Sequence, residues 1–322
     1  MKGSMAPMYK IFLFTAVLFF LLLGAGSAGD QKLSLMLDWF PNVDHLPIYL
    51  AKERGFFERA GIAVDIVSPS DTADALKLAA AGRIDLAVSY QPQAIIAASG
   101  GLTVKVIGRL VSHPLTTLLY LEDGGINRPS DLSGEKIGYT VPGLMDRLLA
   151  AFARINGIED YTPVHVGFAI VPSLTAGKVA AVMGPFKTYE TVTLRQRGYR
   201  AGIFELEKWG IPDYDELIFI CGPSVLAQKA AAVSAFSAAV QAGIDAAQED
   251  PEESLRAYFR QLPDADRQTE SAAFALTLPY YARSQKSDPQ RWQRFADFAL
   301  RHGLIEQPVN VRGLLPEAEP SG

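Results

Sequence analysis

The chain has 322 residues, of which 49% are hydrophobic and 20% charged, and its formal net charge at pH 7 is −5. This composition is typical of a folded protein with a sizeable core, so it excludes an intrinsically disordered chain. An acidic chain without a basic stripe also argues against a nucleic-acid-binding protein.

The N-terminus has the pattern of a secretory signal peptide. Lys2 and Lys10 flank a positive region, and an apolar run of about 13 residues follows, against the roughly 20 that a helix needs to span a bilayer. Small residues at Gly26 and Ala28 suit signal peptidase, so we expect residues 1–28 to be removed and the product to reach the periplasm. The alternative is an uncleaved membrane anchor. Cys221 is the only cysteine, so neither a lipid anchor on a mature N-terminal cysteine nor an internal disulfide is expected.

Strand and helix patterns alternate behind this leader, and no later segment is expected to cross a membrane. Single helices between strands predict βαβ units and largely parallel sheets, and residues 230–302 have a mainly helical pattern. The expected strands lie at 32–37, 63–67, 84–88, 136–139, 164–166 and 180–183, and the expected helices at 46–57, 72–81, 144–156 and 172–176.

Residues 78–88 and 174–182 resemble each other. Each has a helix end, a capping glycine, one basic residue and a buried strand. Any α/β protein can reuse this chemistry, but two lobes of like construction would also produce it. Ligands bind beyond the carboxyl ends of strands in open α/β sheets, so two facing lobes would form a cleft that closes by a hinge motion.

Residues 36–45 (MLDWFPNVDH) and 51–57 (AKERGFF) resemble the opening of periplasmic binding proteins related to thiamine-pyrimidine synthases. The resemblance continues through residues 85–90 and 129–139 and covers most of the chain after the leader. It implies an α/β, type II periplasmic-binding-protein fold, with two lobes joined by a two-segment hinge. The implied divisions are 29–121 and 218–310 for the first lobe, 122–217 for the second, crossings near 118–121 and 218–221, and a tail at 311–322.

The loop after the first expected strand holds the first candidate ligand-binding residues, Asp38, Trp39 and Asn42. Trp39 can offer a flat face to an aromatic ring, and the Asn42 amide both donates and accepts hydrogen bonds. Alternatively, Trp39 packs in the core and Asn42 only caps the next helix. Tyr90, at the end of strand 84–88, is either a second aromatic wall or a half-buried tyrosine at the rim.

The second lobe supplies Thr140 and Gly143, in a loop whose free backbone N–H groups can bind an acceptor or an anion. That geometry is also ordinary for a strand-to-helix loop. Phe186, Tyr189 and Glu190 follow the strand that ends at residue 183.

In the pyrimidine-binding relatives, a glutamate at the position of Glu190 pairs with the aminopyrimidine. A carboxylate can accept from an exocyclic amine and a protonated ring nitrogen together. The alternative for Glu190 is a solvated helix glutamate. The relatives often carry a tryptophan near Phe186, which leaves the identity of the ligand open.

His45 matches a histidine that the eukaryotic pyrimidine synthases of this family use, together with a cysteine-rich iron motif. Because Cys221 stands alone, that motif is absent, and we expect a binding protein rather than an enzyme. His45 then either contacts ligand or only lies near the start of its helix. The other three histidines lack zinc-ligand spacing, so neither a metal nor another cofactor is expected.

These patterns together predict a monomeric periplasmic substrate-binding protein of an ABC importer. It would capture a thiamine-precursor pyrimidine and deliver it to permease and ATPase subunits in the inner membrane, with no nucleic-acid partner. An alkanesulfonate or similar anion, bound through Lys187 and backbone N–H groups, and a riboflavin-like ligand stacked on Trp39 and Tyr90 are alternatives. A pyrimidine-synthase-like enzyme is the alternative from a different functional class.

Overall fold

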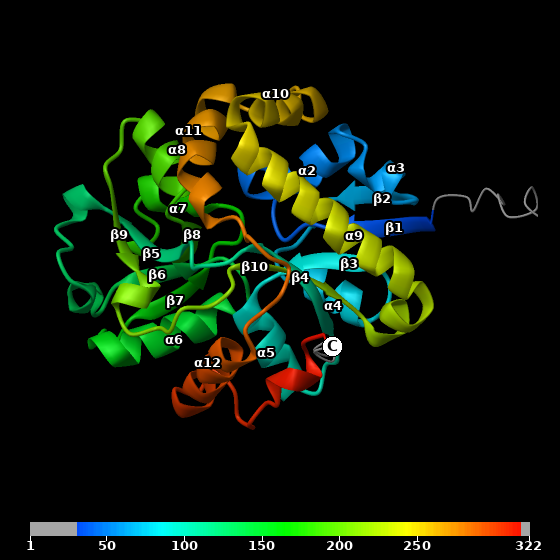
Figure 1. Cartoon of the computed structure of the whole chain (residues 1–322). Coiled ribbons are helices and arrows are strands. Elements are labelled where there is room, and N and C mark those ends of the chain that lie inside the picture. The colour runs from blue at the N-terminus through cyan, green and yellow to red at the C-terminus, as the bar shows by residue number, and fades with distance from the viewer. Residues whose placement is uncertain (1–30, 317–322) are drawn as a thin grey trace, which may run out of the picture.

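The computed structural model describes residues 31–316, which form two α/β lobes, each built on a five-stranded sheet (Figure 1). The strand orders are β2-β1-β3-β10-β4 in the first lobe and β7-β6-β8-β5-β9 in the second. The expected signal peptide, residues 1–28, lies outside the described residues.

The first lobe is discontinuous in sequence. Strand β1 runs parallel to β2 and β3, whereas β10 runs antiparallel to β3 and β4. Because β10 is buried throughout and lies between β3 and β4, the chain that returns from the second lobe completes the first sheet. The strands are β1 (Gln31–Met36), β2 (Ile62–Val67), β3 (Leu86–Ser89), β4 (Lys105–Val111) and β10 (Leu217–Cys221).

The expected helix at 46–57 is two helices, because Gly55 adopts a left-handed conformation (φ +67°) between them. The helices of this lobe are the 3₁₀ helix η1 (Val43–His45), α2 (Leu46–Glu53), α3 (Phe56–Arg59), α4 (Asp74–Ala80), α5 (Gln91–Ser99), α9 (Pro223–Glu249), α10 (Pro251–Gln261), α11 (Arg267–Thr277), η5 (Leu278–Tyr280), α12 (Pro289–Arg301) and η6 (Val311–Gly313).

The second lobe has the same plan. Strand β6 is parallel to β7 and β8, and β5 is antiparallel to β8 and β9. Its strands are β5 (Thr116–Leu121), β6 (Lys136–Tyr139), β7 (Thr162–His165), β8 (Ala181–Phe186) and β9 (Ala201–Glu205). Its helices are η2 (Glu122–Gly124), η3 (Pro129–Leu132), α6 (Met145–Asn156), α7 (Ile170–Thr175), α8 (Glu190–Gln196) and η4 (Leu206–Lys208).

The two similar sequence segments occupy equivalent places in the two lobes. Gly82 (φ +65°) ends α4 before β3, and Gly177 (φ +63°) follows α7 before β8. Strands β3 and β8 are each the central strand of their sheet. The repeat therefore reflects two lobes of like construction rather than chance reuse of a cap.

The chain passes between the lobes at different residues from those expected. Residues 118–121, the expected first crossing, belong to β5, which pairs with β8 and β9 inside the second sheet. The first connection is therefore residues 112–115, between β4 and β5. The return connection, residues 209–216, leads into β10.

Helix α9 corrects the expectation that no segment after the leader could span a membrane, because its length and apolar composition suffice for one crossing. Half of its most apolar window is buried inside the protein, and the helix packs on α2 and β4 (Figure 1). Its packing is that of a core helix of the first lobe.

The expected tail, residues 311–322, begins as packed structure. Val311, Leu314 and Leu315 are buried, and the N–H of Val106 donates to the carbonyl of Leu314 at 2.8 Å. These apolar side chains complete the first lobe beside β4. Residues 317–322, which include the acidic part of the tail, lie outside the described residues.

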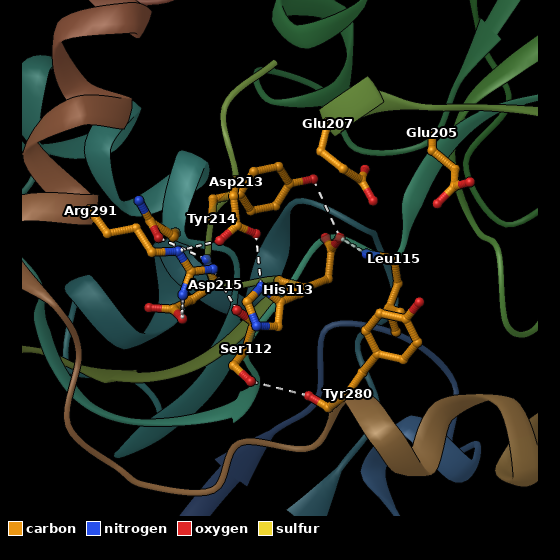
Figure 2. A network of polar contacts seen from close by, with 12 residues as sticks. Ser112, His113, Leu115, Glu205, Glu207, Asp213, Tyr214, Asp215, Tyr280 and Arg291 are labelled. Atoms are coloured by element: carbon orange, nitrogen blue, oxygen red, sulfur yellow. Dashed lines mark hydrogen bonds and ion pairs between the residues drawn. The ribbon is translucent and has the colours of Figure 1, made fainter. Parts of the chain in front are cut away.

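A buried carboxylate ties the return connection to α12 and β4. Asp215 pairs through Oδ1 with the guanidinium groups of Arg109 and Arg291, both at 3.0 Å. Its Oδ2 accepts from Trp292 Nε1 at 2.8 Å. Figure 2 shows Arg291 reaching toward Asp215 beside the connection. The charge of Asp215 is thus compensated at a position that excludes water.

The neighbouring carboxyl, Glu216, joins the two connections to each other. Glu216 accepts from the backbone N–H groups of Leu115 and Thr116, at 2.6 and 2.7 Å, and from the Tyr214 hydroxyl at 3.3 Å. Burial raises the pKa of Glu216 to about 7, while these donors favour its charged form. The outgoing and returning chains are therefore held side by side.

Replacing Asp215 by Ala should lower the free energy of unfolding by about 3–5 kcal/mol, because both arginines and the indole N–H lose a buried partner. The midpoint of urea denaturation measures this loss. Glu253→Ala is the matched control: it removes an exposed carboxylate from Arg256 and Arg260 and should cost less than about 1 kcal/mol. Equal midpoints for Asp215→Ala and wild type would contradict the prediction.

Candidate functional site

A small cavity lies between the two lobes. Most of its wall comes from β8 and from the segments that follow the parallel strands β1, β3, β6 and β8, and α7 and β10 contribute Ile170 and Leu217. Ligand sites in open α/β sheets occur at these carboxyl ends. The residues that line the cavity are Asp38, Trp39, Asn42, Asp44, His45, Tyr90, Thr140, Ile170, Gly184, Phe186, Tyr189, Glu190 and Leu217.

All the candidate residues from the sequence line this cavity except Gly143. Gly143 is exposed in the turn before α6, where its φ of +81° shapes the backbone. Its neighbours Val141 and Leu144 take the inward positions and are buried. Gly143 therefore shapes the turn and does not form part of the cavity wall.

Trp39 reaches from the first lobe to the second. Its ring lies 4.5 Å from that of Phe168, at an interplanar angle of 61°, and Phe40 lies 4.3 Å from the same ring. Trp39 is only half-buried and packs against apolar residues of the second lobe. It is therefore not a core residue of its own lobe, and its indole forms part of the cavity wall.

Asp38 orients two other residues of the cavity. Its Oδ2 accepts from the Tyr90 hydroxyl at 2.6 Å, and its Oδ1 lies 2.9 Å from Nε2 of His45. Burial and the charge of Asp38 keep the pKa of Tyr90 well above 10, so the hydroxyl remains a donor. When Nε2 of His45 donates to Asp38, Nδ1 is left as an acceptor, and this atom has no partner among residues 31–316.

Asn42 caps a helix and also lies in the cavity wall. Its side-chain oxygen accepts from the N–H of Asp44 at 2.8 Å and so caps η1. The residue also lines the cavity. The cap holds η1 in place, and with it His45 at the end of that helix.

Glu190, the first residue of α8, is buried and not a solvated helix residue. Its Oε2 accepts from the N–H of Phe186 at 2.7 Å. Burial raises the pKa of Glu190 to about 7, and the backbone donors only partly oppose this effect. A carboxyl with this pKa changes its protonation readily when a ligand binds beside it.

Tyr189 joins the second lobe to the first beside the cavity. Its hydroxyl donates to Oε1 of Glu270 on α11 at 2.7 Å. The other oxygen of Glu270 accepts from the N–H of Val43 at 2.8 Å and from the Tyr258 hydroxyl at 3.2 Å. Glu270 thereby fixes the start of η1 and the position of Tyr189.

Thr140 is held from both lobes. Its carbonyl accepts from the Thr72 hydroxyl at 2.8 Å, across the cleft. Gly184, with φ +123°, lies so close that a Cβ there would be 2.0 Å from Oγ1 of Thr140. Only glycine permits this approach of β8 to the loop after β6.

Sequence reasoning missed four lining residues and the supporting Glu270. Asp44 lies within residues 36–45, next to His45, and this position could have indicated that it lines the cavity. Ile170 and Leu217 are apolar residues without a motif, and Glu270 lies far along the chain in a helix. Only the folded chain brings Glu270 to the start of η1.

Three carboxyl groups, those of Asp38, Asp44 and Glu190, line the cavity, and none of its described lining residues is Lys or Arg. Lys187, the candidate partner for an anion, pairs instead with Glu205 at 3.0 Å and Glu207 at 2.8 Å. Its Nζ also lies 5.1 Å from the centre of the Tyr280 ring. The cavity is therefore suited to an aromatic ligand that donates hydrogen bonds or is positively charged.

No group of three His, Cys, Asp or Glu side chains in the described part of the chain is placed to hold a metal ion. Cys221 is buried in β10. Burial raises the pKa of its thiol to about 11, which disfavours the nucleophilic thiolate.

Comparison with solved structures shows the fold. The alkanesulfonate-binding protein SsuA from Xanthomonas axonopodis pv. citri, bound to MOPS, superposes with a TM-score of 0.72 at 18% identity, over 90% of this chain and 100% of that one. The chain therefore has the periplasmic-binding-protein fold that the sequence predicts.

Sequence relatives define the family. A protein of Haemophilus influenzae named for thiamine biosynthesis is 35% identical, over 93% of this chain and 96% of the relative. The formylaminopyrimidine-binding protein of Halalkalibacterium halodurans is 30% identical, over 93% and 95%. A 4-amino-5-hydroxymethyl-2-methylpyrimidine phosphate synthase of Uromyces fabae is 27% identical, over 86% and 84%. The model of the family described as NMT1/THI5 like matches residues 42–254, and the chain belongs to this family.

Proposed function

We propose that this protein is the substrate-binding component of an ABC importer and that it captures an aminopyrimidine of the kind found in thiamine precursors. The observation that carries the proposal is the cavity between the lobes, where Trp39 and Phe186 accompany the buried Glu190 and no described lining residue is Lys or Arg. An aromatic ring with an amino group and a basic ring nitrogen matches these walls.

Glu190 is placed to recognise the amino edge of such a ring. Its Oε2 already accepts from the Phe186 N–H, and a carboxylate oxygen has a second lone pair for a ligand N–H. A protonated ring nitrogen beside the amino group completes a two-point, charge-assisted contact. The name of the Halalkalibacterium halodurans relative supports the same ligand class.

Capture and release would use motion of the lobes about the two connections. The contacts of Tyr189 with Glu270 and of Thr72 with Thr140 cross the cleft and would form as it closes. We propose that the protein acts as a monomer in the periplasm, after removal of residues 1–28, and that it delivers its ligand to permease and ATPase subunits. The ligand would leave the cleft chemically unchanged.

A pyrimidine-synthase-like enzyme is the second candidate, because His45 lines the cavity with Nδ1 free and some relatives are named synthases. Two features favour binding over synthesis. The chain has a single cysteine, and the described cavity lining offers no Lys or Arg to a phosphate group.

Protein purified from its own periplasm should carry an aminopyrimidine, which native mass spectrometry followed by release and identification of the ligand would detect. A sulfonate or a flavin in its place would refute the proposed ligand class while leaving the transport role. Conversion of an added aminopyrimidine to another compound would favour the enzyme.

Replacing Glu190 by Gln should weaken binding of 4-amino-5-hydroxymethyl-2-methylpyrimidine by roughly tenfold to a hundredfold, since a charge-assisted contact is lost. Isothermal titration calorimetry gives the ratio. Glu159→Gln makes the same change at an exposed position and should have no effect. Unchanged pyrimidine affinity in Glu190→Gln, or strong binding of a sulfonate by wild type, would contradict the assignment.

Replacing Trp39 by Ala should cost about 1–3 kcal/mol of binding free energy for the same pyrimidine, by analogy with bases stacked on aromatic side chains. Fluorescence or calorimetric titration measures the loss. Tyr199→Ala, an exposed aromatic residue outside the cavity, is the control. The stacking role is wrong if Trp39→Ala binds as tightly as wild type.

A further inference from the structure

Asp44 is a buried carboxyl in the cavity wall with one oxygen unused. It lies in η1 and is 1% exposed. Its Oδ1 accepts from the Thr277 hydroxyl on α11 at 3.1 Å, whereas Oδ2 has no hydrogen-bond partner anywhere in residues 31–316. A buried polar atom without a partner is rare in folded proteins, since it forfeits its hydration. In a binding cavity, such an atom is available to a ligand.

The surroundings of Asp44 disfavour its negative charge while the cavity is empty. Burial, opposed by His45 and reinforced by Glu190, raises the pKa of Asp44 to about 8. The titratable groups that act on Asp44, or respond to its charge, come from every side of the cavity: Asp38, His45, Tyr189, Glu190 and Tyr281, with Glu270 behind them. A hydrogen-bond donor from a ligand would stabilise the charged form of the Asp44 carboxyl against this effect of burial.

We propose that Asp44 is a second ligand-binding carboxyl, and that its Oδ2 accepts a hydrogen bond from an N–H or O–H group on the ring substituent next to the amino group. The inference rests on the proposed aminopyrimidine ligand and adds which derivatives the cavity takes. Glu190 contacts the amino edge of the ring, and Asp44 accepts a hydrogen bond from the substituent.

The two carboxyls come from opposite lobes, Asp44 from η1 and Glu190 from α8. A ligand with donors at both edges therefore bridges the cleft, whereas a ring with only an amino edge contacts one carboxyl. The substituent can be an aminomethyl, acylaminomethyl or hydroxymethyl group. A phosphate at the same position would face two carboxyls with no Lys or Arg among the described lining residues to compensate its charge, so the cavity disfavours phosphorylated compounds.

Isothermal titration calorimetry with two probes tests this assignment. The first probe, 4-amino-5-aminomethyl-2-methylpyrimidine, carries a donor on its substituent, and the second, 4-amino-2,5-dimethylpyrimidine, does not. We expect Asp44→Asn to lower the affinity for the first probe by roughly tenfold or more, while the affinity for the second changes by less than about threefold. Asp297→Asn makes the same change on the surface and should alter neither affinity.

Titration in two buffers of different ionisation enthalpy adds a readout that a purely structural role would not move. An ammonium group beside Asp44 favours the carboxylate, so wild type should release more protons than Asp44→Asn on binding the aminomethyl probe. This difference should vanish with the dimethyl probe.

Equal losses for both probes in Asp44→Asn would show a structural role, and no loss for either would show that Asp44 does not touch the substituent. Both results overturn this inference and leave the proposed function standing. Failure of wild type to bind either probe would instead overturn the proposed function, and the role of Asp44 with it.

Discussion

The cavity depends on how the chain is held where it returns from the second lobe. Two adjacent buried carboxyls, Asp215 and Glu216, hold this part of the chain to different elements. Asp215 bonds to α12 and β4, and Glu216 bonds to the start of β5. Buried charge is tolerated only with matched partners, so each carboxyl admits essentially one local arrangement of the chains around it. Strand β10 then enters the first sheet at a fixed register, and the carboxyl ends of the parallel strands in both lobes face one cleft.

Asp38, Asp44 and Glu190 are all buried in that cleft, and their hydrogen bonds differ. Both carboxylate oxygens of Asp38 form hydrogen bonds, one with His45 and one with Tyr90, and so hold these two residues in the cavity wall. Glu190 keeps part of its hydrogen-bonding capacity, and one oxygen of Asp44 has no hydrogen-bond partner within residues 31–316. Because burial disfavours charge on Asp44 and Glu190, a ligand with well-placed donors gains more from them than it would from exposed carboxylates. In the proposed recognition, the donors of the ligand supply hydrogen bonds that the described residues do not give these two carboxyls.

The charges around the cavity also distinguish it from the anion-binding site considered as an alternative. Lys187 follows Phe186 directly in the sequence, yet its ammonium group is neutralised by Glu205 and Glu207. The SsuA structure shares the fold at 18% identity, so the fold alone does not select the ligand. The side chains that project from the shared strand ends make that choice.

The sequence by itself determined the alternation of strands and helices and most of the cavity wall, and it offered the likeness of the two lobes as one of two explanations for its internal repeat. These features are local: Gly82 and Gly177 end helices before strands, and the loop from Asp38 to His45 directly follows a strand. Only the tertiary structure decided that β5 belongs to the second sheet, that Gly143 lies outside the cavity, and that Glu270 supports η1. Such features depend on contacts between residues far apart in the chain, and local patterns of polarity do not encode which distant partner a buried group will meet.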